Sequence, residues 1–209
     1  VKENNFLGQG IRVDSNALIS TNKFRGKFAV TNPNFNNTDK SLYISAEAIE
    51  TDNYKTFGYK TNKTGFRIGT NFEYLNDFYL GLNSSNFYEK IETNSTASAQ
   101  QQSQEGNYWD SFFKLDMNYD KRNQKFQTSS GFKSFYSLNL PVVSDTNTIK
   151  NYYNYSKYFS FYDKNFSSLS LYLQSANSLN NKNIKLSERL TIPSSRLRGF
   201  EYGRVGPKD

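Results

Sequence analysis

A basic, glycine-rich segment near the C-terminal end has the most specific chemistry in this 209-residue chain. Residues 196–208 read Arg-Leu-Arg-Gly-Phe-Glu-Tyr-Gly-Arg-Val-Gly-Pro-Lys. Arg198 carries a permanent charge that is costly to bury without a carboxylate partner, and a bidentate pair would lock it in place. Gly199 permits a sharp turn or a close approach to a wall. Arg-Gly-Phe alone is most often a surface turn, but in an enclosed lumen the segment would dock by non-covalent contacts with Phe200 as an apolar anchor, and we call it the docking segment.

Covalent chemistry has few candidate residues. The sequence contains no histidine and no cysteine. Their absence removes disulfides, thiolate metal sites, serine–histidine–aspartate catalysis and most zinc sites. Chemistry by carboxylates alone remains open, but an enzyme is the least favoured class. We expect no catalytic residues, no metal and no cofactor.

The composition favours a β-structure with a wet interior. Aromatic residues make up 17% of the chain, whereas all hydrophobic residues together reach only 35%. This balance suits a barrel with a polar lumen, and it also suits a soluble β-sandwich. The net charge of +7 is spread along the chain, so we expect solvated lysines and no nucleic-acid partner. No run of 18 apolar residues and no signal peptide is present.

The docking segment must be positioned by β-strands, which a two-residue period in side-chain polarity indicates. Apolar and polar side chains alternate along most of the chain, which predicts strands with one apolar and one polar face. About nine strands are expected, most of them roughly 9–11 residues long, enough to cross a bilayer at a tilt. The alternating runs lie at 66–74, 113–119, 132–140 and 169–173, and at about 11–20, 24–31, 41–50 and 78–88, with an ambiguous run at 153–162.

The expected connections differ in length at the two ends of the strands. Residues 75–77 and 163–165 are predicted tight turns, whereas 51–63, 89–108 and 141–152 are predicted long polar loops. Strand counting places these turns at one rim and these loops at the other, as in outer-membrane barrels. Two connections depart from this rule: 20–23 is short on the long-loop side, and 120–130 is long on the short-turn side. Strand length and loop asymmetry favour a barrel over a sandwich whose apolar face points inward, and a membrane sheet must close.

Four motifs, in order along the chain, resemble those of the BamA–TamA superfamily of bacterial surface antigens. Three of them are turn motifs, and the fourth is the docking segment. The turn residues are Asn5, Phe6, Leu7, Gly8 and Gly10; Asn32 and Pro33 within 31–35; and Asp120, Arg122, Phe126, Thr128 and Gly131. The docking motif comprises Arg198, Gly199, Phe200, Glu201, Gly206 and Pro207. The resemblance covers the whole chain.

The resemblance implies an all-β fold, a transmembrane antiparallel up-and-down β-barrel of sixteen strands. Residues 1–175 would supply about strands two to eleven, and 176–209 the start of the lumen-directed sixth extracellular loop. The POTRA domains, the first strand and the last five would lie outside this piece of a longer protein. In the family the acidic partner of the loop arginine lies on later strands, so the partner of Arg198 is not expected here.

The resemblance also implies a function in the bacterial outer membrane. The family's central member folds and inserts client β-barrels without ATP. Its partners would be outer-membrane lipid, unfolded client proteins and accessory lipoproteins that bind the POTRA domains. The alternatives are a TamA or two-partner-secretion transporter barrel that exports polypeptides, a passive porin or adhesin barrel, and a soluble carbohydrate-binding sandwich.

Overall fold

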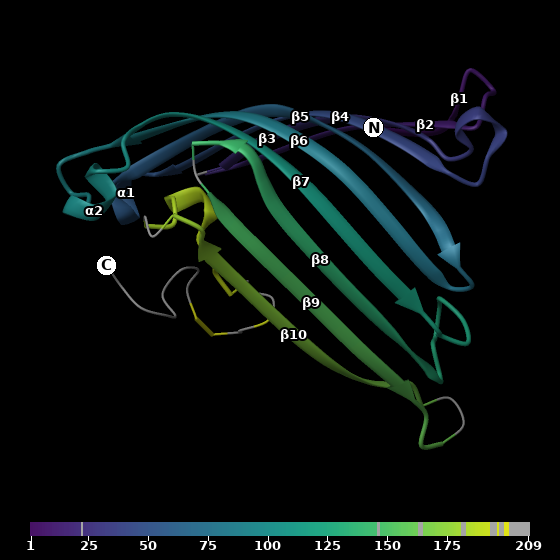
Figure 1. Ribbon diagram of the computed structural model, residues 1–209. Coiled ribbons are helices and arrows are strands. Elements are labelled where there is room, and N and C mark those ends of the chain that lie inside the picture. The colour runs from purple at the N-terminus through teal and green to yellow at the C-terminus, as the bar shows by residue number, and fades with distance from the viewer. Residues whose placement is uncertain are drawn as a thin grey trace.

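Ten strands form one antiparallel sheet in which each strand pairs with its sequence neighbours (Figure 1). The computed structural model describes residues 1–21, 23–145, 147–162, 165–180, 183–192, 196 and 199–200. The strands are β1 (Lys2–Phe6), β2 (Ile11–Ser20), β3 (Lys23–Asn32), β4 (Ser41–Asn53), β5 (Tyr59–Leu75), β6 (Phe78–Thr93), β7 (Gly106–Asp120), β8 (Gly131–Ser144), β9 (Thr148–Phe159) and β10 (Ser167–Ser178). Within the described residues the sheet is open, with β1 and β10 at its edges. The expected all-β up-and-down architecture is confirmed, with ten strands instead of about nine.

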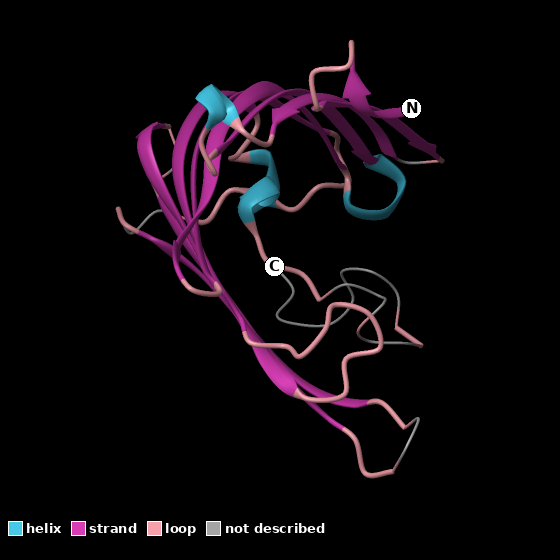
Figure 2. Ribbon diagram, turned by 90° about the vertical axis from the view of Figure 1, so that its right-hand side faces the viewer, coloured by secondary structure: helices cyan, strands magenta, loops and turns pink. Residues whose placement is uncertain are grey.

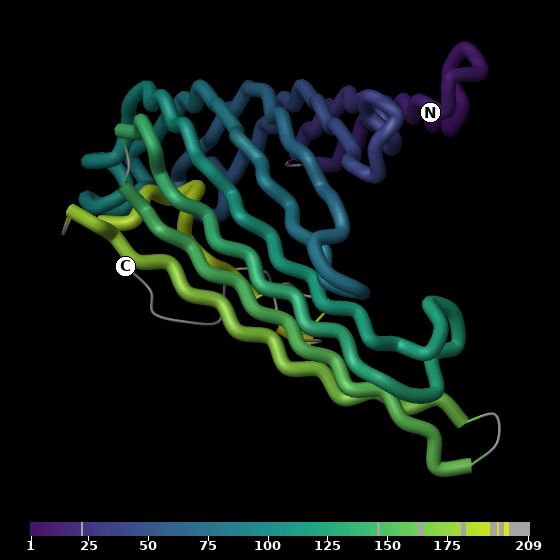
Figure 3. Tube along the Cα trace, turned by 45° about the vertical axis from the view of Figure 1, so that its right-hand side comes forward, coloured from purple at the N-terminus to yellow at the C-terminus, as the bar shows by residue number. Residues whose placement is uncertain are grey.

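Most strands are longer than the expected 9–11 residues, and β5 and β6 reach 17 and 16 residues. Two of the three long loops expected at one end of the sheet are therefore wrong, because strands occupy most of 51–63 and of 141–152, whereas 94–105 remains a long connection. The connections that remain there are 54–58, 94–105 and 145–147. We call this end, on the left in Figure 3, the upper rim. The opposite end, on the right in Figure 3, has the connections 7–10, 33–40, 76–77 and 121–130, and we call it the lower rim.

The expected contrast between a short-turn rim and a long-loop rim is also wrong. Only 94–105 is long at the upper rim, whereas 33–40 and 121–130 are both long at the lower rim. At the upper end of β5, residues 60–64 are polar or charged on both faces, so the hydrophobic alternation stops there. The backbone pairing nevertheless continues, and β5 pairs with β6 from Tyr59 to Leu75. Hydrophobic periodicity therefore marks the apolar part of each strand and misses its polar end.

The sheet curves around a concave face (Figure 2). Phe66, Ile68 and Leu171 are well exposed and alternate with inward residues, as the period of two predicts. Lys63 and Arg67 line the cavity on the concave side. Apolar groups thus point outward and charged groups inward, which is the arrangement of a membrane barrel with a polar interior.

The buried apolar core is small and lies on the concave face near the upper rim. Phe87, Ile91 and Phe112 are almost fully buried there, together with Leu186 from the chain after β10. Phe87, Phe112 and Leu186 also line the cavity. This core therefore forms a floor on which the segment after β10 rests.

The turn between β1 and β2 uses residues that the first motif contains. The Asn5 side-chain oxygen accepts a hydrogen bond of 2.7 Å from the backbone N–H of Gly10. Phe6 ends β1, and the next two residues, Leu7 and Gly8, have φ of 53° and 72°. Gly10 has φ of 69°. Glycine adopts this left-handed backbone at little cost, which accounts for its place in the turn.

The connection between β3 and β4 is organised by Asn32. Its side-chain oxygen accepts a hydrogen bond of 3.1 Å from the N–H of Asn34. Pro33 lies just outside β3, where the strand ladder needs no donor. The short 3-10 turn η1 (Phe35–Asn37) follows, and Phe35 N–H donates to the Lys40 carbonyl at 2.9 Å.

The connection between β7 and β8 is held by an ion pair and a close backbone approach. Arg122 donates to both carboxylate oxygens of Asp120, at 2.8 and 2.7 Å. The buried Thr128 hydroxyl donates to a backbone carbonyl within the turn at 2.7 Å. Gly131 has φ of 99°, and a Cβ there would lie 2.1 Å from the Lys121 carbonyl oxygen. Only glycine fits this position without moving the backbone.

Helical structure is limited to single turns. α1 (Tyr54–Phe57) and α2 (Ala99–Gln102) lie at the upper rim, and η2 (Leu186–Glu188) follows β10. α2 begins with a capping box in which the Ser98 and Gln101 side chains each accept from the other residue's backbone N–H. Among the described residues, none of these helices has the length and apolar character needed to span a membrane.

We predict that Gly131→Ala destabilises the sheet strongly, because the new Cβ would overlap the Lys121 carbonyl and the backbone would be strained. Gly10→Ala is the matched control, since its φ is also positive but no atom lies within 4 Å of the added Cβ. Heat-dependent unfolding of the full-length protein, followed by electrophoretic mobility, measures both. Equal midpoints for the two variants would contradict the steric argument.

Candidate functional site

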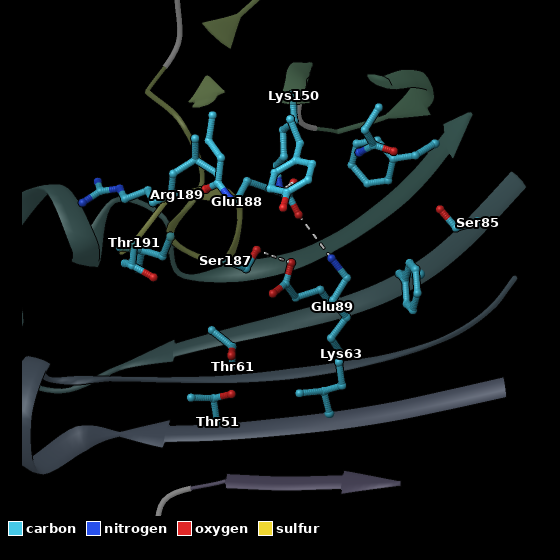
Figure 4. A pocket seen from close by; sticks show the side chains of 18 of the residues that line it. Thr51, Thr61, Lys63, Ser85, Glu89, Lys150, Ser187, Glu188, Arg189 and Thr191 are labelled. Carbon is cyan, nitrogen blue, oxygen red and sulfur yellow. Dashed lines mark hydrogen bonds and ion pairs between the residues drawn. The ribbon is translucent and has the colours of Figure 1, made fainter. Parts of the chain in front are cut away.

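The chain after β10 turns back onto the concave face near the upper rim (Figure 2). We call residues 183–192 the docked segment; it precedes the predicted docking motif at 196–208 and is distinct from it. Its η2 turn presents Lys185, Leu186 and Glu188 to the wall, and all three are almost fully buried. Figure 4 shows Ser187 and Glu188 directed at wall residues that point back toward them. The segment therefore contacts the wall through side chains of opposite charge placed three residues apart.

Lys185 binds two carboxylates on neighbouring strands. Its Nζ lies 2.6 Å from Glu89 Oε2 on β6 and also pairs with Asp110 Oδ2 on β7. Each of these three residues is at most 2% exposed. Burial alone would lower the pKa of Lys185, but Glu89 and Asp110 outweigh burial, so the pKa is raised. Lys185 is therefore held as a cation inside the protein.

Glu188 has the complementary arrangement. Its Oε1 lies 3.2 Å from Lys63 Nζ on β5, and its Oε2 pairs with Lys150 on β9. Burial alone would raise the pKa of Glu188, but the positive charges of Lys63 and Lys150 lower it to about 2. Glu188 is therefore an anion at any ordinary pH.

These six residues form two ion-paired clusters, one around Lys185 and one around Glu188, which together we call the charged lock. Three cations (Lys63, Lys150, Lys185) face three anions (Glu89, Asp110, Glu188), so the charged lock has no net charge. Removing one partner of a buried pair leaves an uncompensated charge, at a cost of roughly 3–5 kcal/mol. The wall carries its two acids between two lysines, so a segment with its own charges reversed would not fit. The lock thus specifies where and in which register the segment docks.

The connection 94–105 adds contacts to the backbone of the docked segment. The Gln104 side-chain oxygen accepts from Leu186 N–H at 2.8 Å, and its amide nitrogen donates to the Ile184 carbonyl at 3.4 Å. The Ser187 hydroxyl donates to Glu89 at 2.8 Å. The Gln104 contacts thus hold the backbone of the docked segment, while Ser187 and the charged lock hold its side chains.

A cavity of about 1500 Å³ remains beside the docked segment. Arg67 of β5 lines this cavity and belongs to a second charged cluster, in which Glu47 on β4 pairs with Arg25 on β3 and, at 3.1 Å, with Arg67. Arg67 also lies over the Phe87 ring at 5.1 Å. Among the described residues no group of three or more histidine, cysteine, aspartate or glutamate side chains is arranged to hold a metal ion.

The structure places the predicted docking motif only in part. Gly199 has φ of 86°, and Phe200 is 57% exposed. Arg198, Glu201, Gly206 and Pro207 lie outside the described residues. Nearby, Arg196 lies 3.8 Å from the centroid of the Tyr172 ring on β10. The predicted carboxylate partner of Arg198 therefore stays a prediction.

The predicted turn residues lie far from the docked segment, at the lower rim. Asn5, Asn32, Asp120 and Gly131 shape connections between strands, whereas the charged lock lies near the upper ends of β5, β6, β7 and β9. The structure therefore does not bring these two groups of residues together. The turn residues have local contacts that fit a structural role.

Sequence reasoning missed the charged lock completely. The sequence pattern assigned Lys63 and Glu89 to loops and Asp110 to no strand, so it gave none of them a position on the concave face. The available signal was their common position, four residues from the upper end of β5, β6 and β7. That signal needs correct strand ends, and the strands predicted from the sequence pattern stop several residues short of the upper rim.

We predict that acid loosens the docked segment through Glu188. Because its pKa in the folded state lies below the ordinary value of 4.5, Glu188 contributes stability above about pH 4.5 and loses it as the pH falls toward 2. Protection of the docked segment from protease, measured against pH in the full-length protein, should fall in this window. The Glu188→Gln variant should show a weaker pH dependence there. An unchanged profile would contradict the assignment.

We also predict that neutralising Glu188 at neutral pH lowers protease protection at least tenfold, because Lys63 and Lys150 would be left without their shared anion. Glu92→Gln is the matched control: it breaks the Lys90–Glu92 pair of 2.6 Å, which is solvent-exposed near the same rim. An exposed pair contributes about 0–1 kcal/mol. Equal effects of the two substitutions would rule out a special role for the charged lock.

Comparison with known proteins agrees with this geometry. Residues 5–209 match the family model described as the Omp85 superfamily domain. The comparison with curated proteins gave no match. Among solved structures, the fold is similar to the crystal structure of BamA from Haemophilus ducreyi lacking POTRA domains 1–3, with a TM-score of 0.85 and 19% identity.

The alignment with that structure covers 99% of this chain and 43% of the other, so the chain spans less than half of its length. The outward apolar face and the inward charges are those of a barrel in the bacterial outer membrane. The resemblance inferred from four sequence motifs is thereby confirmed at the level of the family. The chain belongs to the Omp85 superfamily and forms part of an outer-membrane β-barrel.

Proposed function

We propose that this chain forms one wall of the central subunit of the outer-membrane β-barrel assembly machinery. That subunit would fold and insert client barrels without ATP. The observation that carries the proposal is the docked segment, which is held on the concave wall by the charged lock in a chain of this superfamily. The fold likeness to a BamA structure supports the same choice.

The docked segment argues against a passive pore. Lys185 and Glu188 hold it across the concave face, where an open channel would need free space. Insertion without ATP needs a stable barrel whose strand edges can guide an incoming strand by backbone pairing. The ten strands would supply the rigid wall, and the docked segment would keep the lumen closed while a client assembles.

The proposal assigns the partners by chemistry. The exposed apolar residues of the convex face would contact outer-membrane lipid, as Leu169 at 71% exposure illustrates. Unfolded outer-membrane proteins would be the clients, and accessory lipoproteins would bind POTRA domains of the complete protein. The assignment of residues 176–209 to the sixth extracellular loop remains part of this proposal, as does the docking role of Arg198.

Reconstitution of the full-length protein into liposomes tests the proposed function. An unfolded client barrel added without ATP should become inserted and protease-resistant, faster than in protein-free liposomes. Arg198→Ala should slow this insertion and increase protease cleavage of the docked segment, while heat-dependent mobility still shows a folded barrel. Unchanged insertion and cleavage would show that Arg198 has no role in docking or in client insertion.

Other outcomes would overturn the proposed function in favour of its rivals. Delivery of a soluble polypeptide across the membrane without client insertion would indicate a TamA-like or two-partner-secretion transporter. Steady ion conductance, with no effect on client barrels, would indicate a porin or an adhesin barrel.

A further inference from the structure

The Lys185 ammonium group sits in a cage made by the wall. Glu89 and Asp110 supply carboxylates, and the Tyr108 ring lies 4.8 Å from Nζ. Two anions and an aromatic face together are the groups that recognise an organic cation. The cage thus has the chemistry of a binding site, and the docked segment fills it with its own side chain.

The cage belongs to strands β6 and β7, not to the docked segment. Glu89 pairs directly with Tyr108 across the two strands, and Asp110 lies two residues further on the same face of β7. The Ser144 hydroxyl of β8 also donates to Asp110. Strand register therefore holds the three cage residues in place whether or not Lys185 is present.

Removal of Lys185 would leave the cage without a cation. Two neighbouring carboxylates would then face each other at a buried position, an arrangement that is costly unless a positive charge returns. Oε1 of Glu89 has no hydrogen-bond partner among the described residues although the side chain is 0% exposed. Glu89 also lines the cavity, which gives a small cation a route to the cage.

We propose that Glu89, Asp110 and Tyr108 form a binding site for primary ammonium groups, and that such ligands compete with Lys185 for it. The ligand class is alkylamines and polyamines that carry a linear chain like that of lysine. Binding would displace Lys185 and weaken the hold of the charged lock on the docked segment. The site therefore couples an external cation to the closure of the lumen.

The geometry favours ammonium over other cations. An ammonium group has three N–H donors, enough to reach both carboxylates, and the aromatic face adds attraction for an organic cation. The narrow space, in which Lys185 is 2% exposed, suits a linear chain better than a branched or quaternary group. Metal ions such as Ca²⁺ need six to eight oxygen ligands, more than two carboxylates readily supply.

Chemical rescue of Lys185→Ala in the full-length, liposome-reconstituted protein tests the site. The variant should lose protease protection of the docked segment at least tenfold. Propylammonium, which has the three carbons and the ammonium group that Lys185→Ala removes, should restore most of this protection in a saturable manner. Methylammonium should act more weakly, and K⁺ or tetramethylammonium at equal ionic strength should not act. Rescue by K⁺ as strong as that by propylammonium would show that the effect is charge screening and would overturn the proposal.

Two further variants make the rescue specific. Lys185→Ala combined with Asp110→Asn should not be rescued, because half of the cage charge is gone. Glu188→Gln should not be rescued by amines either, because the cage is then still filled by Lys185. Rescue of either variant to the level of Lys185→Ala would place the amine elsewhere and contradict the proposal.

Competition in the unsubstituted protein completes the test. Spermidine should lower the protection of the docked segment at least twofold more than NaCl of equal ionic strength, and no difference would contradict the proposed competition. All of these measurements follow docking and not client insertion. Absence of amine effects would therefore contradict the ammonium site without bearing on the proposed function. Absence of client insertion would contradict the proposed function without bearing on the ammonium site.

Discussion

Pairing of buried charges is the constraint on which the rest of this structure depends. Lys185 and Glu188 leave water only because the wall offers two carboxylates to one and two lysines to the other. Each pair repays part of a large desolvation cost, and neither side is stable there alone. The order of charges along the wall therefore sets the position of the docked segment, whereas an apolar contact would permit sliding.

This constraint accounts for the length of the strands. The backbone pairing of β5 and β6 continues beyond the alternating apolar part of β5 to Tyr59 and Thr93 at the upper rim. The polar ends carry Lys63 and Glu89 at equivalent heights, four residues from the strand ends. The connection 94–105 then brings Gln104 over the docked segment. Strand extension thus builds the part of the wall on which the segment docks.

The sequence predicted the fold well because its signals are local or shared by a family. Alternation of Phe66 and Ile68 with Arg67 identifies a strand and its two faces without any distant contact. Gly10 and Gly131 indicate turns because a positive φ limits the residue type. The charged lock depends on residues up to 125 positions apart, such as Lys63 and Glu188. No local sequence pattern indicates such pairs. Because the predicted strand ends were wrong, the shared position of Lys63, Glu89 and Asp110 relative to the upper rim could not be recognised.

The most direct measurement is crosslinking, by a short reagent that joins two thiols, of cysteines placed at Gln104 and Leu186, whose contact joins the upper rim to the docked segment. The chain has no cysteine of its own, so the engineered pair would be the only thiols in this stretch. Our account predicts rapid crosslinking in the folded full-length protein, comparable to that of cysteines at the paired positions Thr61 and Ile91. Crosslinking of the control pair alone would contradict the docking of this segment.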